Sequence, residues 1–146
     1  MKAEGALIGA AGLRPTRQRV AILRAVAGER RPVTAQDLYA RLRGTRGSPG
    51  LATIYRTVGA LTEAGLLRTF PAGEGEVAYR LCEPGHHHHL ICEGCGQVVE
   101  IPSCEVEEWA SGVARRRGFT TTGHQADIFG LCTTCQRGAR RPARVS

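Results

Sequence analysis

Two cysteine pairs with identical spacing stand in the second half of the chain. Cys92 pairs with Cys95 and Cys132 with Cys135, and residues 96–131 separate the two pairs. We call each Cys-x2-Cys pair a knuckle. Two knuckles supply four thiolates, which is the ligand set of a closed tetrahedral zinc site with no position left for a substrate. Two redox-active Cys-x2-Cys pairs are the alternative. The pattern favours a structural zinc ion that joins the two ends of one domain.

A run of four histidines, His86 to His89, precedes the first knuckle. Side chains alternate between the two faces of a strand, so His86 and His88 would share one face and His87 and His89 the other. One run of histidines could therefore serve two different metal sites. A solvated basic loop is the alternative. Further metal-binding side chains are offered by Cys82, Glu107 and His124.

The two halves of the chain differ in charge and in ligand content. Residues 1–81 contain 13 Lys+Arg and 6 Asp+Glu (13 − 6 = +7), whereas residues 82–146 contain 7 of each, and all the Cys and His residues lie in this second part. A basic half beside a neutral half suggests that one domain binds nucleic acid, although an Arg-rich solvated surface gives the same excess. We therefore predict domains over residues 1–81 and 82–136, followed by a disordered Arg/Gly/Pro-rich tail over 137–146.

The cellular compartment follows from what the sequence lacks. No apolar run approaches the roughly 20 residues of a membrane helix, and the first residues do not form a signal peptide. We expect a cytoplasmic protein with no membrane contact. Clustered Cys and His in the cytoplasm indicate metal ligands rather than disulfides.

Three short helices are predicted in the basic half. The first follows Thr16 and ends at Gly28, the second begins at Thr34 with a capping box, and the third covers about 51–64 and stops at Gly65. Residues 1–12 are small and Gly/Ala-rich, and we expect them to form a mobile arm.

Two predicted strands, Leu66–Phe70 and Glu76–Leu81, follow these helices as a hairpin. Three helices and a hairpin make a winged helix-turn-helix, whose third helix would enter the major groove. An ordinary three-helix domain is the alternative. The polar face of the third helix offers Thr53, Tyr55, Arg56 and Thr57.

The second half is predicted to mix strands with one helix. Strands are expected over His87–Cys92 and Gln97–Ile101, then a helix from about Pro102 to Gly118, then one or two strands within Phe119–Leu131. The fold class is therefore α+β: an N-terminal winged helix-turn-helix plus a C-terminal α/β domain with a four-cysteine zinc site.

Four segments together resemble the Fur family of bacterial metalloregulators, and most of all its zinc uptake regulators (Zur) of the actinobacterial type. GLRPTRQR (12–19) is similar to the family's first helix and GLATIYRT (50–57) to its recognition helix. HHHHLICEGC (86–95) and IFGLCTTC (128–135) resemble its metal and knuckle motifs. The resemblance covers nearly the whole chain, and it implies a dimer built by the C-terminal domain.

The resemblance also implies roles for individual residues. The four knuckle cysteines would hold structural zinc, and the third helix would read DNA. A regulatory site at the hinge between the domains would use Cys82, His87 and His89. An additional site in the dimerisation domain would use His86, His88, Glu107 and His124. The predicted DNA-binding residues are Arg17, Thr53, Tyr55 and Arg56.

Two features favour zinc within the family, and one departs from its zinc sensors. Pro32 stands where the iron, peroxide and nickel sensors commonly have a His, and the Cys82 thiolate suits zinc better than iron. Actinobacterial zinc sensors place an Asp ligand where this chain has Arg68. The hinge site could therefore have three protein ligands plus water, or borrow Glu74 or Glu76. Cys104 is expected to be a free thiol.

The sequence thus predicts a homodimeric transcriptional repressor of zinc homeostasis genes. Zn2+ would act as corepressor on a palindromic double-stranded DNA operator. An iron, nickel or peroxide sensor of the same family is the first alternative. A zinc-dependent hydrolase or deaminase is less favoured, because the chain lacks the His-Glu-x-x-His and His-x-Glu…Pro-Cys-x-x-Cys patterns. A zinc-ribbon interaction module without sensing is a third alternative, and no enzyme activity is expected.

Overall fold

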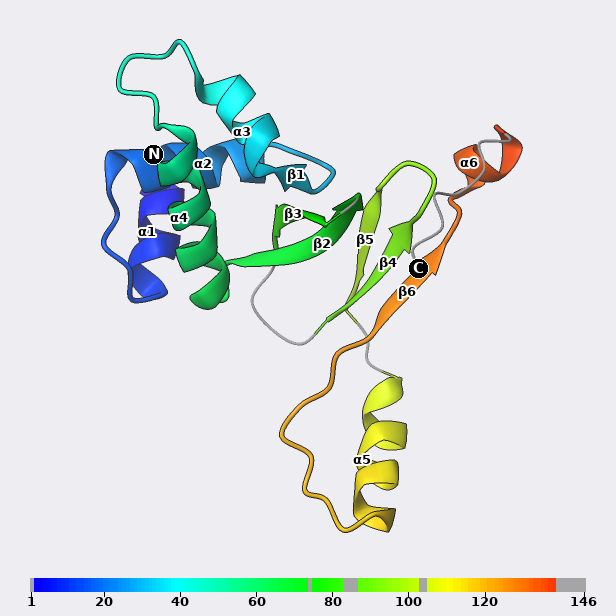
Figure 1. Ribbon diagram of the computed structural model, residues 1–146. Helices are drawn as coiled ribbons and strands as arrows, with labels where there is room; N and C mark the ends of the chain where they lie inside the picture. Colours follow the sequence, from blue (N-terminus) through cyan, green and yellow to red (C-terminus); the bar gives the residue numbers. More distant parts are fainter. Residues whose placement is uncertain (1, 74, 83–86, 103–104, 139–146) are drawn as a thin grey trace. The chain divides into compact units, whose positions relative to one another are not determined.

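The computed structural model describes residues 2–73, 75–82, 87–102 and 105–138 of the chain (Figure 1). The chain divides into two compact units, Met1–Pro84 and Gly85–Ser146. The change of composition at residue 82, from which we predicted a domain boundary, falls near this division. Within the described residues, no helix has both the length and the apolar character needed to cross a membrane.

The first unit contains the three predicted helices. Helix α2 spans Arg17–Ala27 and α3 spans Ala35–Leu42, while α4 spans Leu51–Glu63. The Thr16 side chain accepts a hydrogen bond from the backbone of Arg19, and Thr34 and Asp37 form a complete capping box. The predicted starts of α2 and α3 are therefore confirmed, because the side chains that fix them are visible in the sequence.

The expectation of a mobile arm over residues 1–12 is wrong. Lys2–Ala10 form helix α1, and Ile8 is completely buried in the core of the first unit. Ala and Leu favour helices, and the apolar side chain of Ile8 gives the helix a docking point. An ion pair also joins the two helices, since Arg24 Nε of α2 lies 3.1 Å from Glu4 Oε1 of α1.

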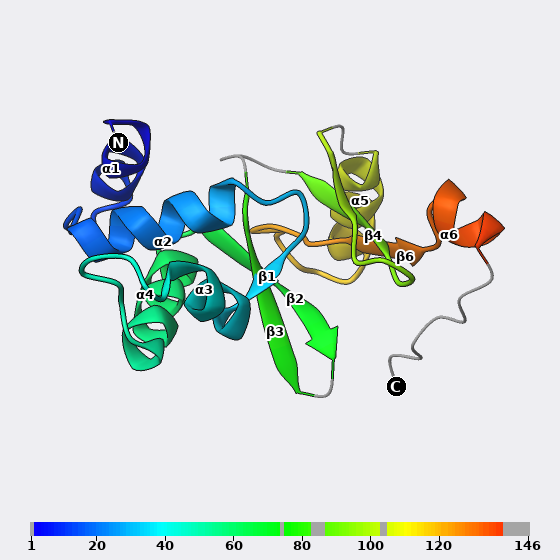
Figure 2. The same cartoon turned by 90° about the horizontal axis from the view of Figure 1, so that it is seen from above.

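The hairpin of the first unit belongs to a three-stranded antiparallel sheet. Strands β1 (Val33–Thr34), β2 (Leu67–Gly73) and β3 (Glu76–Leu81) lie in the order β1-β3-β2. In Figures 1 and 2 the four helices gather together and the β2–β3 hairpin extends from them. This arrangement is a winged helix-turn-helix. Its core is built by apolar residues of all four helices and the sheet, among them Ile22, Leu38, Ile54, Leu61 and Tyr79.

The described residues of the second unit form a mixed sheet and two helices. Strands β4 (His88–Cys92), β5 (Val98–Ile101) and β6 (Asp127–Gly130) have the order β5-β4-β6. Strand β4 runs antiparallel to β5 and parallel to β6. Helix α5 (Val106–Arg116) precedes β6, and the short helix α6 (Thr133–Arg137) follows it.

Several predicted boundaries in the second unit are corrected. The long helix begins at Val106 rather than near Pro102, and residues 119–126 form no regular strand. Helix α6 was not predicted, and it includes Arg137, with which the predicted tail begins. The remainder of that tail, from residue 139 onward, lies outside the described residues.

The second unit leaves much of its apolar surface exposed. Helix α5 has no buried residue among those described, and Trp109 on it is 68% exposed. The paired residues Leu90, Val99 and Ile128 lie in one row across the sheet and are each 42–51% exposed. A unit with so little core of its own gains stability from a bound metal or a partner subunit.

Candidate metal centres and DNA-binding surface

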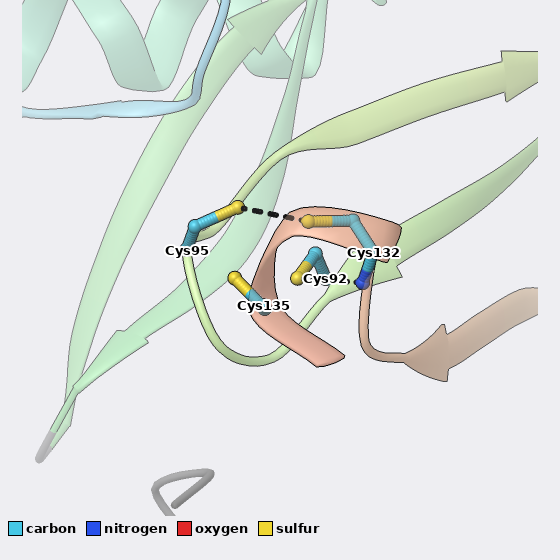
Figure 3. Close-up of side chains that lie close together, drawn as sticks. All are labelled: Cys92, Cys95, Cys132 and Cys135. Atoms are coloured by element: carbon cyan, nitrogen blue, oxygen red, sulfur yellow. Dashed lines mark hydrogen bonds between the residues drawn. The ribbon is translucent and has the colours of Figure 1, made fainter. Parts of the chain in front are cut away.

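Four cysteine sulfurs converge at one end of the sheet in the second unit (Figure 3). The Sγ atoms of Cys92, Cys95, Cys132 and Cys135 all lie within 4.8 Å of one another. Cys92 ends β4 and Cys132 caps α6, and the pairing of Cys92 with Gly130 aligns the two knuckles. Residues separated by most of the second unit are thereby brought into one group, which we call the four-cysteine cluster.

The electrostatics of the four-cysteine cluster suit a cation. The backbone N–H of Cys132 donates to Cys92 Sγ at 3.2 Å. This hydrogen bond, together with those from the backbone of Cys95 and Gly94, lowers the pKa of the Cys92 thiol to about 6. The neighbouring thiol of Cys132 has the opposite effect on Cys135, whose pKa it raises. Four sulfurs at this separation can all ionise only around a positive ion, and four protein ligands fill a tetrahedral zinc site completely.

Gly94 sits inside the first knuckle against the second. A Cβ atom at Gly94 would lie 3.0 Å from both Cβ and Sγ of Cys135 and 3.2 Å from Cδ2 of Leu131. These distances are too short for a side chain without displacement of the neighbours. The close approach of the knuckles therefore favours glycine at this position, because a side chain would force Cys135 and Leu131 to shift by a few tenths of an ångström.

A second group of ligand atoms lies on one face of the sheet. His87, His89 and Glu100 each offer a ligand atom, and these atoms lie within 4.8 Å of one another. The rings of His87 and His89 have centroids 4.8 Å apart, and His89 is completely buried. We call these three residues the regulatory cluster, after the role that the family resemblance implies for His87 and His89. Two imidazoles and a carboxylate fit zinc, and they fit other divalent metals as well.

Sequence reasoning missed Glu100, although a signal for it exists. The knuckle closes the β4–β5 hairpin with a bond from the Cys92 N–H to the Gln97 carbonyl, and from there Ile91 pairs with Val98. Counting outward from that pair places Glu100 directly opposite His89. Facing residues of an antiparallel pair share one face, so the strand register brings Glu100 to the histidines.

The opposite face of β4 carries a third group. His88 Nε2 lies 3.4 Å from His124 Nε2, and His124 Nδ1 lies 3.5 Å from a carboxylate oxygen of Glu107. We call His88, Glu107 and His124 the auxiliary cluster. Glu107 comes from α5, and His124 comes from the irregular segment before β6 rather than from a strand as expected. His86, the fourth predicted member, lies outside the described residues.

The remaining candidates for the hinge site belong to the first unit. Cys82 directly follows β3, and Glu76 begins that strand at the tip of the hairpin. Arg68, at the position where the family resemblance implied an Asp, lies in β2 with its guanidinium 5.9 Å from the centre of the Phe70 ring. Glu74 and Cys104 lie outside the described residues.

The predicted DNA-binding residues lie on two helices of the first unit. Tyr55 on α4 is 48% exposed, Arg56 is exposed beside it, and a guanidinium nitrogen of Arg56 lies 3.4 Å from the Thr53 hydroxyl. Arg17 is exposed at the first position of α2. Thr57 is only 7% exposed, so its expected place on the polar face is wrong.

Sequence reasoning also missed two neighbours of this surface. The beginning of α2 and the first turns of α4 line one hollow, to which Gln18 and Arg19 contribute together with Thr53 and Arg56. The N–H groups in the first turn of a helix attract anions, and here two such turns lie beside arginine side chains. The hollow therefore has the chemistry of a phosphate-binding surface.

Comparison with known proteins agrees with this architecture. The model of the ferric uptake regulator family matches residues 10–129. A zinc uptake regulation protein of Mycobacterium tuberculosis is 41% identical over 88% of this chain and 99% of its own length. A ferric uptake regulation protein of Campylobacter jejuni is 31% identical over 85% of this chain and 80% of its own.

A solved structure of similar fold gives the same result. The ferric uptake regulator from Pseudomonas aeruginosa with manganese has a TM-score of 0.66 and 30% identity, over 89% of this chain and 98% of that one. Family match, relatives and fold agree over most of the chain. The chain therefore belongs to the ferric uptake regulator (Fur) family of dimeric DNA-binding transcription regulators, and it is not an enzyme.

Proposed function

We propose that the chain is a homodimeric repressor that binds a palindromic operator in the cytoplasm when zinc occupies its regulatory cluster. The observation that carries this proposal is the convergence of His87, His89 and Glu100 on one sheet face, separate from the four-cysteine cluster. The four-cysteine cluster has the closed ligand set of a structural ion. The second group of ligands can therefore bind and release a metal ion without dismantling the fold.

Zinc is proposed as the metal for two reasons. A relative with 41% identity is a zinc uptake regulation protein. The predicted thiolate ligand Cys82 is a soft donor, which suits zinc better than iron. Cys82 precedes His87 by five positions in the chain, and together with the regulatory cluster it would complete four ligands. We propose Glu100 as the fourth ligand, in place of the water, Glu74 or Glu76 considered from the sequence.

The way in which metal would act on DNA follows from thermodynamic linkage. If zinc stabilises the dimer conformation whose two winged helices fit successive major grooves, zinc and DNA must strengthen each other's binding by the same factor. The exposed apolar surface of the second unit, including Trp109 and Ile128, is proposed to bury itself in the dimer. Arg17, Thr53, Tyr55 and Arg56 are proposed to contact the operator.

An iron sensor is the second candidate. Two histidines and a carboxylate are also a suitable ligand set for iron, and the chain is 31% identical to a ferric uptake regulation protein. A titration of operator binding against free zinc, with Fe2+ and Ni2+ in parallel, separates the candidates. For each metal, the free concentration that activates operator binding is compared with the normal cellular concentration of that metal. We expect this ratio to be lowest for zinc. Activation by Fe2+ alone would replace the zinc proposal with the iron one.

A further inference from the structure

A carboxylate outside the three clusters contacts the buried histidine of the regulatory cluster. Asp127 Oδ1 lies 3.3 Å from His89 Nδ1. His89 is completely buried, and the Asp127 side chain is 25% exposed. The contact is built by the sheet, because His89 on β4 and Asp127 on β6 are partners in the parallel register.

His89 thus stands between two carboxylates in one row across the sheet. Glu100 is its partner on β5, and Asp127 is its partner on β6. Glu100 belongs to the group of mutually close ligand atoms, whereas Asp127 does not. The two carboxylates therefore have different positions relative to a metal ion in that group.

A histidine ring offers two nitrogens with different tasks. A nitrogen that donates its proton to a carboxylate cannot bind a metal through the same position, so the other nitrogen carries the free lone pair. A carboxylate behind a metal-bound imidazole holds the ring in one orientation and one tautomer, and it makes the ligand nitrogen more basic.

We propose that Asp127 is a positioning residue of the regulatory site. It accepts the Nδ1 proton of His89, fixes the Nε2 lone pair toward the metal and thereby sets the metal concentration at which the site fills. This inference rests on the proposed function, because it assumes that His87, His89 and Glu100 bind a regulatory metal ion.

Two substitutions at Asp127 separate its charge from its hydrogen bond. Asp127→Leu removes both, whereas Asp127→Asn keeps an oxygen that can accept from Nδ1 but removes the charge. Glu108→Gln is the matched control, because Glu108 is an exposed carboxylate of the same unit outside all three clusters. All variants are tested as the full-length dimer with zinc retained in the four-cysteine cluster.

Zinc affinity is measured by competition with a chromophoric chelator. We expect Asp127→Leu to weaken zinc binding at the regulatory site by about 10- to 100-fold and Asp127→Asn to weaken it less. Glu108→Gln should bind zinc as the wild type does. Unchanged affinity in Asp127→Leu overturns the proposal. A lower melting temperature and loss of zinc from the four-cysteine cluster in both Asp127 variants also overturn it, since they reveal a purely structural role.

Two spectroscopic measurements complete the test. Nitrogen NMR of wild-type His89 before the regulatory site is loaded should show the proton on Nδ1, and a proton on Nε2 refutes the proposal even if Asp127→Leu does not fold. Cobalt absorption bands should keep their shape in Asp127→Asn, because a changed band shape would make Asp127 a direct ligand.

The His87→Ala variant distinguishes this inference from the proposed function. If His87→Ala binds as many zinc ions as the wild type, the regulatory site itself is wrongly assigned. If His87→Ala loses one zinc ion while Asp127→Leu binds normally, only the role of Asp127 fails.

Discussion

His89 and Glu100 face each other directly across the antiparallel strands β4 and β5. Their distance is therefore set by the hydrogen-bonded sheet rather than by a loop. Metal ligands held on rigid strands lose little conformational freedom on binding. The regulatory cluster is preorganised in this respect, and its ligands can be tested without unfolding the sheet.

The two histidine clusters should differ in how strongly they control operator binding. His87→Ala should weaken zinc binding at the regulatory site by more than about 100-fold, because loss of an outer partner alone costs about 10- to 100-fold. Zinc-dependent operator binding should disappear while the dimer stays folded. His124→Ala should give only a graded shift in the zinc concentration for half-maximal operator binding. Fluorescence anisotropy with labelled operator DNA measures both effects.

Glu100→Gln is the sharper variant at this site. It preserves side-chain size but removes the charged ligand, so it should weaken zinc-dependent operator binding nearly as much as His87→Ala. Glu105→Gln removes an exposed carboxylate just before α5 and serves as its control.

Equal and complete loss of operator binding in His87→Ala and His124→Ala would contradict the ranking of the regulatory cluster above the auxiliary cluster.

The clearest successes of sequence reasoning come from residues that act locally. The Thr34–Asp37 capping box fixes the start of α3 within four residues of chain, so the pattern alone reveals it. Gly65 has φ +76°, the left-handed conformation expected after the end of α4. The Cys-x2-Cys spacing likewise reflects the local geometry of a knuckle.

The failures come from contacts between distant segments. Burial of Ile8 depends on packing against the helices that follow, so a window over residues 1–12 contains no sign of it. Asp127 reaches His89 only through the parallel β4–β6 register. Phe119 is 72% exposed and stands in an irregular segment, although its neighbourhood has strand-like composition.

Helix α1 should contribute measurably to the stability of the first unit. Ile8→Ala is expected to lower the free energy of unfolding by about 2–4 kcal/mol, because it leaves a cavity in a fully buried position. Leu7→Ala, at a neighbouring position that is 38% exposed, should cost clearly less. Urea denaturation followed by circular dichroism compares the two. Equal stability of both variants would mean that α1 does not dock as described.

Loss of one knuckle thiolate should affect folding rather than sensing alone. Cys92→Ser removes a ligand of the four-cysteine cluster, and a structural zinc ion contributes its binding energy to folding. We expect less than one zinc ion per chain in this cluster, a melting temperature lower by on the order of 10 °C, and a weakened dimer. Calorimetry and sedimentation measure these changes. A dimer with unchanged melting would contradict a structural role.

The space around Gly94 gives an independent test of the four-cysteine cluster. Gly94→Ala places a methyl group 3.0 Å from Cys135, so Cys135 has to shift by a few tenths of an ångström and stability should fall by about 1–3 kcal/mol. Gly123→Ala is the control, because no atom beyond Gly123 itself and its two neighbours in the chain lies within 4 Å of the added Cβ. Zinc should leave the Gly94→Ala variant faster when a chelator is added, whereas Gly123→Ala should release it at the wild-type rate.

Arg56, the exposed arginine on α4, should contribute to the affinity for the operator without affecting the metal sites. Arg56→Ala removes a cation from the hollow formed by the starts of α2 and α4, and we expect operator binding to weaken by about 1–3 kcal/mol. If Arg56 contacts a phosphate, the loss of affinity is similar for unrelated DNA. The number of counterions released on binding, which the salt dependence of the affinity reports, then falls by about one. If it contacts a base, the loss is confined to the operator.

Arg115→Ala, which removes the same charge from α5 of the second unit, should leave DNA binding unchanged. Wild-type affinity in Arg56→Ala, measured at two salt concentrations with zinc saturating, would show that α4 does not read the operator through this residue.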